Sequence, residues 1–256
     1  MKIPKIKKTN KPEKVKKKKT KKINKKNAVL IFIISCGIIV ASTVLAFALY
    51  IIVTSPDFVP QQLYTKEATV IYAKDGSEIA RIGDANVELV TYNDLPEVLI
   101  DALVATEDSR YFQHNGFDAA RFIKASMGQL AGKNAGGAST LSMQVIKNTY
   151  TSNEAKGLKG IIRKFTDIYM AVFKLEAVYT KEEIMEFYLN SQWLSVSGSS
   201  YSDDIKGVEQ GSQYFFGKSV ADLTLAEASL LVGMFNNPFF LNPYNYPEAA
   251  SERRSV

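Results

Sequence analysis

The sequence predicts a mainly α-helical domain with a small β-hairpin at its start, preceded by one membrane-spanning helix. Three observations predict this fold class. Residues 28–53 form one apolar run without a charge, and residues 68–83 hold two short apolar runs around a Lys-Asp-Gly-Ser turn. Beyond residue 94, helix-start signals repeatedly precede apolar residues at helical spacing.

The first 27 residues form a basic tail. They contain 14 Lys and one Glu, a net charge of +13, so the rest of the chain carries −7 within the total of +6. A tail of this composition cannot bury a core, and we expect it to be disordered. A Lys-rich run could bind nucleic acid, but beside an apolar run it more simply sets membrane topology and touches anionic headgroups. We therefore expect no nucleic-acid partner.

The apolar run at 28–53 is long enough to cross a hydrocarbon core of about 30 Å, whereas the apolar core of a signal peptide has only about 7–15 residues. We expect a retained single-pass membrane anchor. The preceding Lys cluster places the N-terminus in the cytoplasm. Residues 54–67 then form a Pro-bearing linker, and residues 68–256 form one extracellular domain.

The exported residues carry local signals for most elements. The hairpin at 68–83 is followed by a helix start at 94–97, with Asp94 as the N-cap. Two Thr-x-x-Glu capping boxes begin at Thr180 and Thr224. One stripe predicts a long amphipathic helix: Leu158, Ile161, Ile162, Phe165, Ile168, Tyr169, Val172 and Phe173. The only Cys lies in the apolar run and there is only one His, so neither a disulfide framework nor a zinc site is expected.

The stretch EDSRYFQHNG, residues 107–116, ends the first of these helices. Glu107 follows Leu99 and Leu103 at intervals of four, so it shares their apolar face, while Asp108 is turned by about 100°. A carboxylate at the edge of an apolar face suits a proton acceptor. The alternative is an acid that only hydrogen-bonds a neighbouring loop, and this helix alone favours that alternative.

Two further segments suggest an anion site. At 134–148, a Gly-rich entry leads into a helix that Ser139 or Thr140 can cap, and Thr140, Gln144 and Lys147 share one side. At 159–167, Lys159, Arg163 and Asp167 are spaced by four, with Lys164 adjacent. The plain alternative for the second segment is a solvated face, in which an Arg–Asp pair contributes about 0.2–0.5 kcal/mol. The other interpretation is a cationic clamp for a phosphate-bearing ligand.

In their order, these segments resemble the bacterial peptidoglycan glycosyltransferases, which comprise the transglycosylase domain of class A penicillin-binding proteins and the monofunctional cell-wall transglycosylases. The resemblance covers about residues 60–256. Four patterns carry it: E-D-x-x-F-x-x-H-x-G at 107–116, with its aromatic at Tyr111 or Phe112; G-x-S-T with Q and K-N at 137–148; R-K-x-x-E at 163–167; and Y-L-N at 188–190.

The resemblance implies a lysozyme-like fold with an apolar, membrane-facing lobe, and lipid II with the growing glycan chain as substrates. Glu107 would take the proton of the acceptor GlcNAc 4-hydroxyl, whose oxygen attacks the donor MurNAc C1 with inversion and expels polyprenyl diphosphate. Asp167 would assist the donor end. The implied substrate-binding residues are Lys147, Lys159, Arg163, Ser139, Thr140 and Gln144.

The same resemblance implies supporting roles. Asp108, Phe112, Gly116 and Asn190 would brace the site, and His114 would fix a turn, since nothing gives it a proton to move. No cofactor is required. A divalent cation, Mg²⁺ or Mn²⁺, could bind at the donor diphosphate with Asp167 as a ligand, and other cell-wall synthesis proteins are candidate partners.

The chain also departs from the family pattern. Asp167 replaces a Glu, Lys159 replaces the usual Arg, and residues 191–207 are longer and more polar than usual. The exported part has neither Ser-x-x-Lys nor Lys-Thr-Gly, so we expect no transpeptidase within it. Residues 252–256 fall inside the family's Arg-Arg-x-x-Val-Leu motif, which leaves a longer, bifunctional protein open. Two other functions stay open: an inactive scaffold for cell-wall enzymes, and a lysozyme-type hydrolase.

Overall fold

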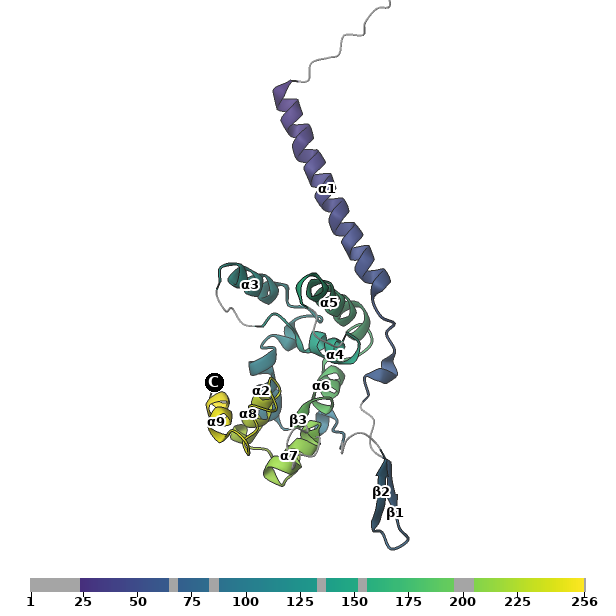
Figure 1. Ribbon diagram of the computed structural model, residues 1–256, viewed down its shortest axis with the longest axis vertical. Helices are drawn as coiled ribbons and strands as arrows, with labels where there is room; N and C mark the ends of the chain where they lie inside the picture. The colour runs from purple at the N-terminus through teal and green to yellow at the C-terminus, as the bar shows by residue number, and fades with distance from the viewer. Residues whose placement is uncertain are drawn as a thin grey trace, which may run out of the picture. The chain divides into compact units, whose positions relative to one another are not determined.

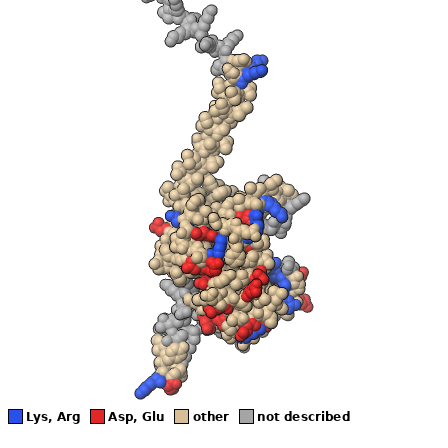
Figure 2. Space-filling model, turned by 180° about the vertical axis from the view of Figure 1, so that it is seen from behind, with Lys and Arg blue, Asp and Glu red and all other residues tan. Residues whose placement is uncertain are grey.

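The computed structural model describes residues 24–64, 69–82, 88–132, 137–151, 156–195 and 205–255. The chain forms two compact units, Met1–Leu49 and Tyr50–Val256. Helix α1 (Lys25–Thr54) contains the apolar run and is long and apolar enough to cross a membrane. Figure 2 shows its uncharged surface, with Lys side chains only at its start. The basic tail before residue 24 lies outside the described residues.

The second unit is mainly helical, which confirms the predicted fold class (Figure 1). Its two small sheets are antiparallel pairs, β1 with β2 and β3 with β4. Its elements are η1 (Pro60–Gln62), β1 (Thr69–Tyr72), β2 (Glu78–Ile82), η2 (Tyr92–Asp94), α2 (Glu97–Glu107), η3 (Tyr111–Gln113), α3 (Ala119–Leu130), α4 (Leu141–Thr149), α5 (Gly157–Met170), η4 (Ala171–Leu175), α6 (Lys181–Asn190), β3 (Trp193–Ser195), β4 (Ile205–Lys206), α7 (Val208–Phe216), η5 (Val220–Asp222), α8 (Leu225–Met234) and α9 (Pro247–Arg254).

The hairpin forms as predicted. The Asp75 carboxylate accepts hydrogen bonds from the Ser77 hydroxyl (2.6 Å) and the Ser77 backbone N–H (3.0 Å). These two bonds lower the pKa of Asp75. Gly76 adopts a φ of 85°, which a residue without a Cβ reaches at no steric cost.

The capping boxes at Thr180 and Thr224 are confirmed, but Asp94 does not cap a helix. Its carboxylate instead accepts from the backbone N–H (2.8 Å) and hydroxyl (2.7 Å) of Thr91. Helix α2 begins only after Pro96, because a proline holds the preceding residue in an extended conformation, and Leu95 has a ψ of 127°. The prediction of Asp94 as N-cap was therefore wrong.

The core of the second unit surrounds α2 and α4. Helix α2 packs against α8, which also contacts α9, and α4 packs against both α5 and α6 (Figure 1). Leu99 and Leu103 are fully buried, as their shared apolar face predicted, and Tyr111 in η3 is fully buried as well. The last turn of α2 therefore starts from a rigid base.

Helix α5 differs from its prediction in length and in orientation. It ends at Met170 and continues as a π-helical turn, η4, rather than as one long α-helix. Of the predicted apolar stripe, Leu158 is 71% exposed and Phe173 is 65% exposed, whereas Asp167 and Thr166 are buried. The helix thus leaves part of the predicted stripe exposed, packs Ile168 and Tyr169 against the core, and directs a carboxylate inward.

Candidate active site

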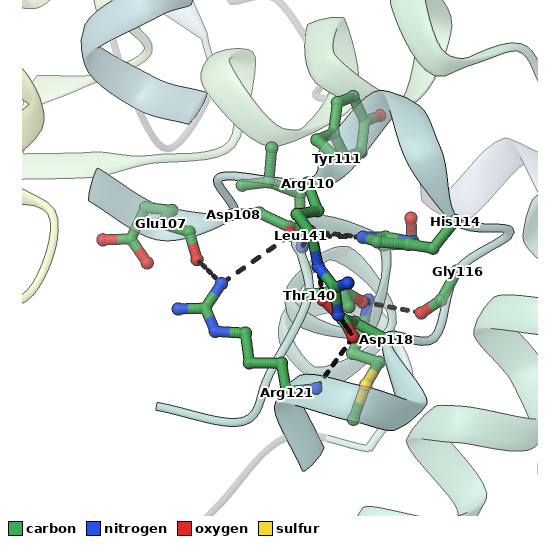
Figure 3. Close-up of polar contacts among 12 residues, drawn as sticks. Glu107, Asp108, Arg110, Tyr111, His114, Gly116, Asp118, Arg121, Thr140 and Leu141 are labelled. Atoms are coloured by element: carbon green, nitrogen blue, oxygen red, sulfur yellow. Dashed lines mark hydrogen bonds and ion pairs between the residues drawn. The ribbon is translucent and has the colours of Figure 1, made fainter. Parts of the chain in front are cut away.

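Glu107 is the last residue of α2, and its side chain points away from the cluster around Asp108 (Figure 3). Its carboxylate accepts two hydrogen bonds from neutral amides: Gln144 Nε2 donates to Oε2 (2.9 Å) and Asn236 Nδ2 donates to Oε1 (3.2 Å). An ionised carboxylate has about four acceptor positions, so two remain for a substrate hydroxyl. The arrangement can hold a general base and still leave it able to take a proton.

Tyr188 sets the orientation of the Gln144 amide. Its hydroxyl donates to Gln144 Oε1 over 3.4 Å, which turns Nε2 toward Glu107. Burial, with a smaller contribution from the Glu107 charge, raises the pKa of Tyr188 far above its ordinary value. The hydroxyl therefore remains a neutral donor. Gln144, predicted to orient substrate, lies against the predicted base.

Asp108 is buried and joins three segments (Figure 3). Its oxygens lie 3.0 and 3.1 Å from His114 Nε2, and Oδ2 accepts from the Leu141 backbone N–H over 3.0 Å. Arg121 Nη1 lies 3.7 Å from Oδ1 and donates to the Glu107 backbone carbonyl over 2.9 Å. Asp108 thereby connects the end of α2, the following turn and the start of α4.

His114 faces the Asp108 carboxylate with Nε2, so the tautomer that carries its hydrogen on Nε2 makes the hydrogen bond. Among the described residues, the buried Nδ1 atom has no hydrogen-bond partner. The polar contact that His114 makes is therefore the one to Asp108, and its role as a brace stays a prediction.

Gly116 is a position that requires glycine. Its φ is 79°, and a Cβ there would lie 3.0 Å from the backbone C and O of Ala171 in the π-helical turn. Its carbonyl accepts from the Thr140 hydroxyl over 2.6 Å, and that hydroxyl in turn caps α4 through the Met143 N–H (3.2 Å). Thr140 is fully buried and joins α4 to the turn at Gly116, and its predicted part in orienting substrate stays a prediction.

The two aromatics of the first motif differ in burial. Tyr111 is fully buried, its hydroxyl donates to the Lys181 carbonyl over 2.6 Å, and the Lys181 ammonium lies 4.5 Å from its ring centroid. Phe112, which we predicted as the brace, is 49% exposed and contacts Tyr111 edge-on. Tyr111 is therefore the buried aromatic of this motif, and the bracing role of Phe112 stays a prediction.

Asn190 holds the segment at Val90, which leads into α2. Its side-chain amide forms a pair of hydrogen bonds with the backbone of Val90, accepting from N (3.0 Å) and donating to O (2.8 Å). Glu186, one turn earlier on α6, accepts from the Tyr92 N–H over 2.6 Å. Helix α6 thus holds the segment that leads into α2.

The second candidate carboxylate, Asp167, lies among cations. It is buried and accepts from the Thr151 hydroxyl over 2.5 Å. Burial raises its pKa, and the nearby charges of Arg163, Lys164 and Lys147 act in the opposite direction.

Lys164 is the third of the cations near Asp167, and the sequence analysis noted it only as the residue next to Arg163. Its ammonium donates to the Ser139 hydroxyl over 2.5 Å. Burial lowers its pKa, and Asp167 partly offsets that effect. Ser139, predicted to bind substrate, thus lies at the cationic end and not beside Glu107.

A pocket of about 430 Å³ opens at this end, with Lys159, Arg163, Thr151 and Thr166 among its lining residues. The Nε atom of Arg163 is buried and has no hydrogen-bond partner among the described residues. Two cations and two hydroxyls suit an anion with several oxygens, such as a diphosphate. The pocket brings together Lys159 and Arg163 as their spacing by four predicted.

A divalent cation fits the residues at Asp167 poorly. Mg²⁺ and Mn²⁺ prefer several oxygen ligands, usually including carboxylates. Within the described ranges, no group of three or more His, Cys, Asp or Glu side chains could hold a metal ion. The charges that act on Asp167 are those of three cations, which would repel a metal.

Helix α4 connects the two ends. Gln144 lies against Glu107, and Lys147, one turn later, acts on Asp167. Sequence reasoning missed Asn236, which is 129 residues from Glu107, and the role of Arg121. No spacing rule links residues so far apart. Lys164 could have been found, because it belongs to the R-K pattern at 163–164.

Comparison with known proteins agrees with this geometry. Residues 75–256 match the family model described as Transglycosylase. The chain is 35% identical over 229 residues to penicillin-binding protein 1A of Vibrio cholerae serotype O1 (strain ATCC 39315 / El Tor Inaba N16961), covering 89% of this chain and 26% of that protein. It is 34% identical over 209 residues to penicillin-binding protein 1A of Streptococcus oralis, covering 81% and 31%.

A third relative is penicillin-binding protein 1A/1B of Bacillus subtilis (strain 168), 32% identical over 204 residues that cover 79% of this chain and 21% of that protein. The chain therefore spans about a fifth to a third of the length of these relatives. The family match covers most of the chain and includes both candidate carboxylates. The chain belongs to the transglycosylase family, and it corresponds to the transglycosylase domain of class A penicillin-binding proteins.

Proposed function

We propose that this protein is a membrane-anchored peptidoglycan glycosyltransferase that polymerises lipid II into glycan strands. The observation that carries the proposal is that two different groups of side chains lie near the two ends of α4. At one end a carboxylate is held by neutral amides, and one turn away begins a group of cations around a second carboxylate. Glycosyl transfer from a lipid diphosphate needs both a base and a clamp for the leaving group.

In the proposed reaction, Glu107 takes the proton from the 4-hydroxyl of the acceptor GlcNAc. The freed oxygen bonds to C1 of the donor MurNAc while the bond from C1 to the diphosphate oxygen breaks, so the configuration inverts. Lys159 and Arg163, with Lys147 nearby, stabilise the negative charge on the departing polyprenyl diphosphate. Lysozyme-type hydrolysis would have no diphosphate to stabilise, and the cationic pocket favours transfer over it.

We propose that the cations, rather than a bound metal, neutralise the leaving group. The residues around Asp167 support this, because they supply positive charge and only one carboxylate. Activity should then persist in excess EDTA. Recovery of activity only on addition of Mg²⁺ or Mn²⁺ would contradict this part of the proposal.

The proposal includes a position at the outer surface of the cell membrane. Its support is α1, the basic tail before it, and exposed apolar side chains on α3 and α5: Ile123, Met127, Leu158 and Ile161. Lipid II cannot leave the bilayer, so tethering the enzyme raises its concentration at the substrate plane. The growing glycan chain is the second substrate, and other cell-wall synthesis proteins are the proposed partners.

The test is glycan synthesis by the purified full chain in detergent, with labelled lipid II and separation of products by length. We expect polymer from the wild type and none from Glu107→Gln. No polymer from the wild type, with or without divalent cations, would contradict the proposal and favour the inactive scaffold. Shortening of preformed glycan would instead identify a hydrolase.

The replacement of the family's Glu by Asp at position 167 gives a companion test. Asp167→Glu restores the longer side chain, and a misplacement of about 1 Å can change a rate on the order of 100-fold. A large gain in rate would mean that Asp limits the natural enzyme. No gain would mean that the pocket around Thr151 and Arg163 has adapted to Asp.

A further inference from the structure

Asn236 lies where two packed helices bring their ends together. Helix α8 packs along α2, and Asn236 is the second residue after α8 ends at Met234. Hydrogen bonds hold the backbone on both sides of it: Phe235 N–H donates to Val232 O (3.1 Å) and Asn237 N–H donates to Met234 O (3.0 Å). The side chain is exposed, yet its amide reaches the carboxylate of Glu107.

The chemistry of the contact is that of a neutral donor on a base. Only Nδ2 of Asn236 can face Glu107 Oε1 favourably, since two oxygens would repel each other. An amide gives the carboxylate a hydrogen bond without adding a positive charge. A Lys or Arg in this place would favour the ionised carboxylate more strongly and weaken it as a proton acceptor.

Two donors, one on helix α4 and one in the turn after α8, define the plane of the Glu107 carboxylate. Gln144 on α4 holds Oε2, and Asn236 after α8 holds Oε1. The terminal torsion of a Glu side chain is broad, so one donor alone leaves the group free to rotate about the remaining bond. With both donors in place, the unused acceptor positions of the two oxygens face a fixed direction.

We propose that Asn236 is a positioning residue for Glu107, which fixes the direction in which the base meets the acceptor hydroxyl. The inference rests on the proposed glycosyltransferase reaction for its rate effect, but the contact itself is independent of it. Asn236 touches no reacting atom in this role. It acts through the carboxylate, and the rate should depend on the chemistry of its amide more than on its size.

The experiment compares Asn236→Asp with Asn236→Ala. Asp has the shape of Asn but replaces the donor with a second negative charge facing Glu107, so repulsion displaces the base. We expect kcat to fall about 100-fold in Asn236→Asp and about tenfold in Asn236→Ala, with KM within about twofold in both, because substrate binding keeps its other contacts. Asn236→Gln should recover part of the loss in the alanine variant.

Asn237→Asp is the matched control. Asn237 is the next residue of the same loop, and its Oδ1 accepts from the Phe240 N–H over 3.2 Å, which Asp can continue to do. It should remain within about twofold of the wild type, since the added charge does not face the base. A loop that is merely sensitive to change would instead tolerate Asn236→Asp better than Asn236→Ala, and that order would overturn the inference.

A stability measurement separates this inference from the proposed function. Asn236→Asp should lower Tm in the wild-type background, where two carboxylates meet, and much less in Glu107→Gln, whose amide can donate to the new carboxylate. Equal Tm changes in both backgrounds would overturn the contact even if the wild type is active. If the Tm changes differ between the two backgrounds but the wild type makes no polymer, the contact is supported and the proposed glycosyltransferase reaction is contradicted.

Discussion

The two candidate carboxylates end up in opposite environments, although both are acids on helices of the same small unit. Glu107 is half-buried and receives hydrogen bonds from two neutral amides. Asp167 is buried, accepts from a hydroxyl and lies in the field of three cations. The difference lies in the neighbours. Two neutral amides contact Glu107 and leave acceptor positions on its oxygens for a substrate hydroxyl, whereas Asp167 is buried beside three cations, and burial still raises its pKa.

The strongest test of this contrast replaces the base. In Glu107→Gln the side chain keeps its size but can no longer take a proton, and the rate should fall about 100- to 10,000-fold. Glycan synthesis from lipid II measures the rate, and an unchanged Tm would show that the fold is intact. A rate within tenfold of the wild type would mean that the base lies elsewhere.

The next test removes a cation at the other end. Arg163→Gln takes a charge from the pocket and should lower the rate about 100-fold, because charge on the leaving group is then stabilised less. Arg163→Lys should recover part of the loss. Lys124→Gln, at an exposed position on α3, removes the same charge elsewhere and should have little effect. Equal losses at both positions would indicate a general charge effect and not a clamp.

The ionised Asp167 side chain should lower the free energy of unfolding at neutral pH. Its pKa is raised in the folded chain above the ordinary value of 3.8, so ionisation is harder there than in the unfolded chain. Stability of the wild type therefore falls as pH rises from about 4 through the raised pKa. Asp167→Asn should be more stable than the wild type at pH 7, and the difference in the free energy of unfolding should shrink toward pH 4.

Calorimetry of the full chain in detergent at several pH values measures this difference. A less stable Asn variant at pH 7 would mean that attraction to Arg163, Lys164 and Lys147 outweighs the cost of burial. In that case the contrast with Glu107 would be sharper still, because Asp167 would then act mainly as a structural counter-charge.

The smallest expected effect concerns the orientation of Gln144. Tyr188→Phe removes the hydroxyl that holds the amide, and kcat should fall about threefold with an unchanged KM, in line with the loss of one long hydrogen bond. Tyr214→Phe on α7 is a matched control, since its ring contacts Phe215 and Tyr244. No change in kcat would mean that the Gln144 amide keeps its orientation toward Glu107 without the Tyr188 hydroxyl.

Much of the fold followed from local chemistry. The hairpin, the two Thr-x-x-Glu caps and the apolar helix α1 depend on residues within a few positions of one another, and all three appear as expected. The failures had two causes, one local and one in the tertiary packing. Pro96, two residues after Asp94, delayed the start of α2. Packing left Leu158, Ile161, Phe165 and Phe173 of the predicted stripe exposed and buried Thr166 and Asp167.

By itself, the sequence determined most of the helices and the order of the motifs that hold the proposed base and the proposed clamp, because helical spacing and short motifs are local. Only the tertiary structure decided which side chains from distant segments come into contact. Packing of α2 against α8 brings Asn236 to Glu107, although 129 residues separate them in the sequence. Gly116 lies close to Ala171, and its carbonyl accepts a hydrogen bond from the Thr140 hydroxyl. Contacts of this kind depend on how helices cross, which no spacing within one segment encodes.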